Sequence, residues 1–229
     1  MLQDFGTDIW IADGPVVVGG GGFRYPTRMA VMRLADGELV VWSPVSLSLE
    51  MRQAVGRLGP VGFIVPPNAL HHSFVGEWQE AYPHAKTLAP PTLAEKCADL
   101  RFDGALAATA PSSWEGQIDL IIFENAIASE AVLFHRPSGT AIFTDLLQNL
   151  PEDWYHGWRA LVARLDLMMG PVAEVPRKFR LATRDRTAAR ASLAKVLEWP
   201  TERILMAHGR PILTDARQHL RRAFSWLTR

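Results

Sequence analysis

The feature that most constrains the fold is a short apolar run that ends at two prolines and leads to adjacent histidines. Val61–Val65 predicts a buried strand. Pro66 and Pro67 end it, because proline has no backbone N–H to donate to a sheet. The chain then delivers His71 and His72 just before a segment with helical spacing. Polar side chains on a loop at a strand end are typical of functional sites in α/β proteins, so this stretch predicts such a fold and places a candidate site in it.

Two further strand exits carry residues of the same chemical kind. Residues 131–135 and 140–144 predict a hairpin, and Asp145 directly follows its second strand. Residues 203–207 predict a last short strand, and His208 follows it. We expect these two loops to meet the histidine loop at one edge of the core.

The remaining pattern alternates strands and helices without a repeat or a long linker. The turn Asp36-Gly37 between two apolar runs predicts another hairpin. Residues 19–22 are four glycines without the spacing of a nucleotide-binding loop, so they predict a flexible turn. Further strands are expected at 9–12, 16–18, 29–34, 38–42, 105–108 and 118–123, and helices at 46–58, 74–81, 154–169, 186–197 and 214–227. We therefore expect one domain over residues 1–229.

The composition limits the classes of binding partner that can be expected. Lysine plus arginine equals aspartate plus glutamate, at 24 each, which gives no indication of a nucleic-acid partner. Apolar runs stay well short of membrane-spanning length, so we expect no membrane partner and a small-molecule substrate or ligand instead. Cys97 is the single cysteine, which excludes an intrachain disulfide and suits a cytoplasmic protein. Eight tryptophans fit a filled core, an aromatic pocket or a contact between copies, so a homo-oligomer stays open.

Three places in the chain resemble the metallo-β-lactamase superfamily. The first is strand 61–65 with its histidine loop, where that superfamily carries His-x-His-x-Asp-His. The second is the hairpin segment 139–147, which is similar to the one ending in a metal-bridging aspartate. The third is segment 204–209, which is similar to the last strand and its terminal His-Gly. The resemblance implies an α/β (α+β) fold, a four-layer αβ/βα sandwich of two mixed β-sheets flanked by helices.

A narrower resemblance covers about the first two-thirds of the chain. It rests on residues 28–34, Asp36-Gly37, Ser43-Pro44, Pro67-Asn68 with the two histidines, and residues 144–146. These are similar to an uncharacterised bacterial family of the superfamily for which no activity is established.

The histidine motif departs from the superfamily pattern. Pro67 and Ala69 stand where its two leading histidines belong, His71 replaces its aspartate, and His72 keeps its final histidine. Residues 125–129, where another histidine is expected, contain none. One of the usual two metal sites has thus lost its imidazoles.

The other metal site still has a complete set of candidate ligands, namely His71, His72, Asp145 and His208. Imidazoles with a carboxylate suit a divalent metal ion, zinc foremost and iron or manganese next. Zinc lowers the pKa of a bound water to about 7 and so supplies a nucleophile for hydrolysis. We expect Asp145 and His72 to be catalytic in such a metal-dependent hydrolase. Substrate-binding or ligand-supporting roles are expected for four further residues: Glu77, Glu130, His135 and Arg210.

The opposing hypothesis is a non-catalytic binding or scaffold protein that keeps the fold with a degenerate metal site. Adjacent histidines point in divergent directions on regular backbone, so one of them could be structural. Asp145 and His208 could likewise satisfy a turn or a backbone carbonyl. Redox chemistry at iron ranks behind both hypotheses, because the histidine set is incomplete. The residue pattern names no substrate.

Overall fold

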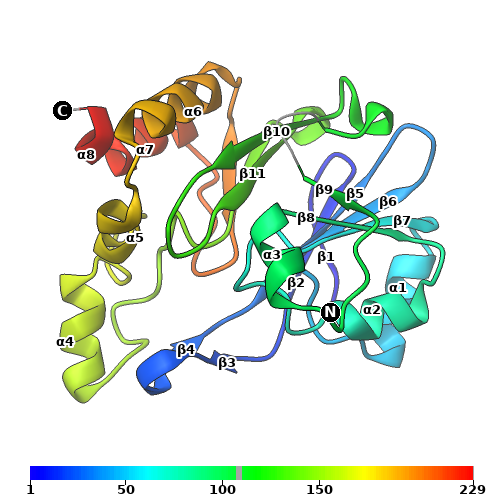
Figure 1. Cartoon of the computed structure of the whole chain (residues 1–229), viewed down its shortest axis with the longest axis horizontal. Coiled ribbons are helices and arrows are strands. Elements are labelled where there is room, and N and C mark those ends of the chain that lie inside the picture. Colours follow the sequence, from blue (N-terminus) through cyan, green and yellow to red (C-terminus); the bar gives the residue numbers. More distant parts are fainter. Residues whose placement is uncertain (107–109, 229) are drawn as a thin grey trace.

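Two mixed β-sheets form the centre of the molecule in this computed structural model, which describes residues 1–106 and 110–228 (Figure 1). The larger sheet has the order β1-β2-β5-β6-β7-β8-β9 and is antiparallel from β1 to β6 and parallel from β6 to β9. Its strands are β1 (Gln3–Gly6), β2 (Ile9–Asp13), β5 (Arg28–Arg33), β6 (Leu39–Trp42), β7 (Val61–Val65), β8 (Lys86–Ala89) and β9 (Gly104–Ala105).

The smaller sheet has the order β10-β11-β12-β13, with only the last pair parallel. Its strands are β10 (Ile118–Phe123), β11 (Glu130–His135), β12 (Thr140–Phe143) and β13 (Arg203–Met206). A separate hairpin pairs β3 (Val17–Val18) with β4 (Arg24–Tyr25) and contains the glycine run in its turn.

The two sheets pack face to face through alternate residues of their strands. In β5, Ala30 and Met32 join the central cluster with Leu133 and Leu205 of the smaller sheet. Their neighbour Val31 lies in the cluster on the outer face. Successive side chains of a strand point to opposite faces, so one sequence run supplies two apolar cores.

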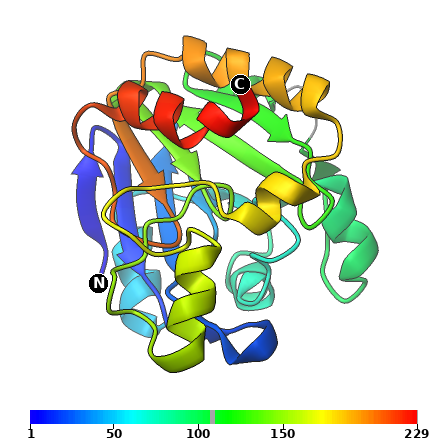
Figure 2. The same cartoon turned by 90° about the vertical axis from the view of Figure 1, so that its left-hand side faces the viewer.

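Helices cover both outer faces. Met51 of α1 and Trp78 of α2 pack against the larger sheet, and Leu193 of α6 and Leu220 of α7 pack against the smaller one (Figures 1 and 2). The helices are α1 (Leu49–Gly56), α2 (Val75–Ala81), α3 (Pro91–Lys96), α4 (Gly157–Leu165), α5 (Arg177–Ala182), α6 (Arg186–Glu198), α7 (Ala216–Ala223) and α8 (Ser225–Thr228). The layers are helix, sheet, sheet, helix, which confirms the predicted fold class.

Helix ends explain where the predicted elements were too long. Helix α1 begins at Leu49 because the Ser48 side chain accepts the Met51 N–H and caps it. Asp185 caps α6 in the same way, as expected. The predicted helix at 154–169 forms only as α4.

Of the strand expected at 105–108, the structure describes Ala105 at the end of β9 and Leu106, while residues 107 and 108 lie outside the described ranges. No helix in the described part of the chain is long and apolar enough to cross a membrane.

A candidate metal centre

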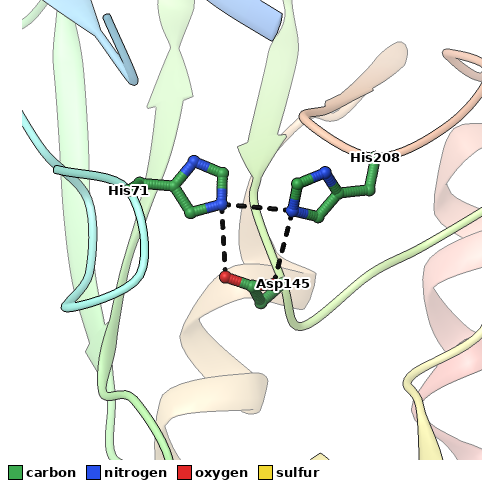
Figure 3. A group of neighbouring side chains, drawn as sticks. All are labelled: His71, Asp145 and His208. Carbon is green, nitrogen blue, oxygen red and sulfur yellow. Dashed lines mark hydrogen bonds and ion pairs between the residues drawn. The ribbon is translucent and has the colours of Figure 1, made fainter. Parts of the chain in front are cut away.

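Three of the predicted ligands converge where β7, β12 and β13 end. His71 follows β7, Asp145 follows β12, and His208 follows β13. Figure 3 shows the two imidazole rings facing each other beside the carboxylate. The Nε2 atoms of His71 and His208 are 3.2 Å apart. His71 Nε2 lies 3.2 Å from Asp145 Oδ2, and His208 Nε2 lies 3.4 Å from Asp145 Oδ1. We call His71, Asp145 and His208 the donor cluster.

His208 is held by its far ring nitrogen. Its Nδ1 donates a hydrogen bond to the Pro26 carbonyl oxygen at 2.7 Å. A carbonyl only accepts, so the proton of neutral His208 sits on Nδ1 and the Nε2 lone pair faces the cluster. The next residue, Gly209, has φ +128°, and a Cβ there would come within 2.3 Å of the Asn149 carbonyl oxygen. Glycine is therefore required for this loop to turn His208 inward.

His71 is held in a similar way by a side chain. Its Nδ1 lies 2.9 Å from the Ser43 hydroxyl, which can donate or accept. The loop that presents it is closed by Asn68, whose Oδ1 accepts the Leu70 N–H at 2.8 Å. The Nε2 atom of His71 is therefore directed at the cluster.

Asp145 is fixed from two sides. Its Oδ2 accepts a 2.9 Å hydrogen bond from the side-chain nitrogen Nδ2 of Asn68. The Asn68 side chain is fully buried. Below it, the buried Glu130 carboxylate accepts the backbone N–H groups of three successive residues: Thr144 at 2.7 Å, Asp145 at 2.8 Å and Leu146 at 3.0 Å. These bonds fix the backbone from which the Asp145 side chain projects.

The electrostatics favour an ionised Asp145 beside a neutral His71. Burial alone would raise the pKa of Asp145, but the neighbouring imidazoles of His208 and His71 hold this pKa well below its usual range. Burial lowers the pKa of His71 despite the hydrogen bond and charge of Asp145. Burial and the nearby Asp145 charge raise the pKa of Glu130 to about 7. The cluster thus presents the anionic Asp145 carboxylate beside the neutral His71 imidazole.

The spacing of the cluster fits a single metal ion. Zinc–nitrogen bonds of about 2.0–2.1 Å at tetrahedral angles place neighbouring donors about 3.3–3.4 Å apart. The observed separations are 3.2, 3.2 and 3.4 Å, and one ligand atom from each residue lies within 4.8 Å of the others. Each imidazole also has its second nitrogen hydrogen-bonded, as is usual for metal-binding histidines. These residues suit a divalent ion with open positions toward the adjoining cavity.

The cluster forms one wall of a cavity of about 390 Å³. This volume lies within the range of small-molecule sites, about 300–1,000 Å³. The other walls come from the β3–β4 hairpin, the loop after β7, the β10–β11 loop and α5, with lining residues that include Val18, Tyr25, Leu70, Phe74, Ile127, Lys178 and Phe179.

The remaining predicted site residues lie outside the donor cluster. His72 lies outside the donor cluster. Burial and the nearby charge of Lys96 lower the pKa of its half-buried ring. Glu77 accepts the Leu47 N–H at 2.8 Å and so fixes the loop before α1. His135 is buried at the far end of β11 beside Ser138, and Arg210 is exposed. None of these four residues lines the cavity, whereas Glu130 supports the cluster from below.

Sequence reasoning assigned no role to three contributors. Ser43 and the Pro26 carbonyl orient the histidines, and Arg28 donates to the Met206 and Gly209 carbonyl oxygens at 3.0 and 2.5 Å, next to His208. Ser43 has φ +49°, which is rare for a residue with a side chain. Apart from the Ser43-Pro44 break after β6, no local pattern marks these positions, because their partners are distant in sequence.

The chain has the metallo-β-lactamase fold. A metallo-β-lactamase from Hirschia baltica superposes with a TM-score of 0.63 at 12% identity, covering 100% of this chain and 97% of that one. FIM-1 from Pseudomonas aeruginosa, a metallo-β-lactamase in its mono-zinc form, gives 0.64 at 8% identity, covering 99% and 95%. The metal-soaked Flv1 flavodiiron core from Synechocystis sp. PCC6803 gives 0.66 at 11% identity, covering 100% of this chain and 60% of that one.

Within this fold, residues 8–156 match the family described as a domain of unknown function, DUF4336, and the chain belongs to that family. No curated protein matches the chain in sequence. The matched segment contains His71 and Asp145 but ends before His208.

Proposed function

We propose that the protein binds one divalent metal ion through His71, Asp145 and His208 and hydrolyses a small molecule in the adjoining cavity. The observation that carries this proposal is the set of donor separations, 3.2, 3.2 and 3.4 Å, which matches the edges of a tetrahedral coordination sphere. The similarity to metallo-β-lactamases supports the fold in which such a site lies.

A metal ion held here would supply Lewis-acid chemistry and a water of lowered pKa, with zinc as the first expectation and iron or manganese as the next. The chain supplies the orientation. Ser43 and the Pro26 carbonyl fix the imidazoles, while Asn68 holds Asp145 Oδ2. Apolar cavity walls would lower the local polarity around the reacting bond, which would strengthen these electrostatic contacts.

Redox chemistry at iron is the second candidate function. Two histidines and one carboxylate with open positions are typical of non-haem iron sites. The flavodiiron core is among the structures similar to this chain. The metal that the site selects distinguishes the two candidate functions.

The first test is metal content. Protein purified without chelator is analysed for transition metals, and stripped protein is titrated with zinc, iron(II) and manganese(II). We expect one equivalent of one metal. Less than roughly a tenth of an equivalent without uptake on titration would overturn the proposal, because a tight site is expected to fill.

The second test separates hydrolysis from binding alone. The metal-loaded protein is assayed on ester, amide and phosphodiester substrates, with His208→Ala as the control. Metal-dependent turnover that His208→Ala abolishes is expected. Full metal occupancy without turnover on any of the three classes would favour the non-catalytic binding alternative.

A further inference from the structure

The rim of the cavity is built from exposed apolar side chains on three separate loops. Val18 of the β3–β4 hairpin is 71% exposed, Leu70 of the loop after β7 is 44% exposed, and Ile127 of the β10–β11 loop is 45% exposed. All three line the same cavity as the donor cluster. Single exposed apolar residues are ordinary on a protein surface, but three from distant parts of the chain around one opening form an apolar entrance.

The apolar lining continues from the rim toward the donor cluster. Tyr25, Phe74 and Phe179 line the same cavity as the rim residues and the two histidines. The ring of Tyr25 lies 5.4 Å from that of His208, measured between centroids. A ligand at the cluster therefore has the aromatic ring of Tyr25 beside it.

Charge in the cavity wall is sparse. Lys178 is the only lysine or arginine among the described residues that line it. Its Nζ lies 3.3 Å from Asp166 Oδ2, so much of its charge is compensated within the protein. The walls do not favour a highly charged body such as a polyphosphate.

We propose that the substrate is an ester or amide of a carboxylic acid with an extended apolar chain, which lies against Val18, Leu70 and Ile127 while the acyl carbon reaches the donor cluster. The chemical part rests on the proposed function. In the reaction, the oxygen of water bonds to the acyl carbon, the carbon–oxygen or carbon–nitrogen bond breaks, and the leaving alcohol or amine takes a proton. The products are the long-chain acid and that alcohol or amine.

If the cavity buries the apolar chain of the ligand, binding affinity should depend on the length of that chain. Transferring one CH₂ from water to an apolar environment increases affinity roughly three- to fourfold. A product acid should therefore bind more tightly with each added CH₂ until the chain extends past the rim. A site that recognises only the carboxylate would show no such dependence.

The experiment measures binding of acetate, hexanoate and decanoate by calorimetry, on protein with and without zinc loading. We expect affinity to rise by at least tenfold from hexanoate to decanoate. Leu70→Ser and Ile127→Ser should each reduce that rise by threefold or more, and both side chains are exposed enough for the fold to tolerate the change. Leu213→Ser is the matched control, because Leu213 is 60% exposed and does not line the cavity.

The outcomes separate this inference from the proposed function. A chain-length dependence that the rim variants reduce, in protein that takes up no metal, would support the apolar site and overturn only the metal-dependent hydrolase. Metal uptake with no chain-length dependence would overturn the inference alone. A chain-length dependence that both rim variants leave intact would also overturn the inference. So would an affinity that does not change with chain length in a dimeric protein whose rim variants are monomeric, because the rim would then be a contact between copies.

Discussion

The Nε2 atoms of His71 and His208 face each other at 3.2 Å. His208 presents a lone pair there, because its proton is committed to the Pro26 carbonyl. If His71 donates its Nδ1 proton to Ser43, two lone pairs meet and a cation between them is needed for stability. If Ser43 instead donates to His71 Nδ1, a proton on His71 Nε2 can bridge to His208 or Asp145. The two tautomers of His71, each matched by a turn of the Ser43 hydroxyl, therefore allow the cluster both a metal-free and a metal-bound arrangement.

The first prediction distinguishes the two adjacent histidines. His71→Ala should weaken zinc binding by roughly 100-fold or more, beyond the 10–100-fold typical of residues that only support ligands. His72→Ala should change it less than threefold, because His72 is outside the donor cluster. Zinc affinity is measured by competition with a chromogenic chelator. Equal losses in both variants would show that His72 is a ligand after all.

The second prediction concerns the carboxylate beneath the site. Glu130→Gln replaces one accepting oxygen with an NH₂ group that cannot accept the N–H groups of residues 144–146. A buried donor left without a partner costs about 1–3 kcal/mol. The free energy of unfolding, from denaturant titration, should fall by that amount, and zinc affinity should fall with it.

Glu77→Gln is the matched control for Glu130→Gln. Glu77 accepts a single backbone N–H, from Leu47, which the remaining oxygen of glutamine can still accept. Stability and zinc affinity should both stay close to wild type. If the two variants lose zinc affinity to the same extent, Glu130 has no specific part in placing Asp145.

The candidate site could be predicted from the sequence because its polar residues directly follow buried strands. The runs before His71, Asp145 and His208 have the apolar character of buried strands, and the structure brings the three exits together. The choice between His71 and His72 could not be made from the pattern, since neighbouring side chains diverge. It depends on how Asn68 closes the loop through the Leu70 N–H.

Supporting contacts were hidden for a different reason. Ser43 meets His71 from 28 positions away, and the partner of His208 is a backbone carbonyl 182 positions away. A carbonyl has no sequence identity, and proline is in no way marked as an acceptor. Glu130 was expected near the site, but its contacts with three backbone N–H groups require the tertiary register of β11 and β12.

The third prediction isolates the hydroxyl that orients His71. Ser43→Gly removes it, and glycine accepts the φ of +49° without strain. Zinc affinity should fall roughly tenfold, as for loss of other groups that orient a ligand, with little change in stability. Ser73→Gly is the control, because Ser73 lines the same cavity while the hydrogen bonds to the two histidines come from other residues. An affinity for zinc unchanged in Ser43→Gly would remove Ser43 from the site.

The fourth prediction links stability to pH through His135, which is fully buried with Nδ1 2.8 Å from the Ser138 hydroxyl. Burial lowers its pKa from 6.5 to about 4, against a small opposing effect of the Asp8 charge. As pH falls below 6.5, the unfolded chain takes up a proton that the folded protein refuses, so stability is lost between pH 6.5 and about 4. The loss specific to this residue is roughly 3 kcal/mol, at 1.36 kcal/mol per pKa unit.

The free energy of unfolding is therefore measured against pH for wild type and for His135→Asn, which keeps a polar group near Ser138 but does not titrate. The difference between the two should shift toward the variant as pH falls through this window, and parallel curves would show that His135 titrates normally in the folded protein.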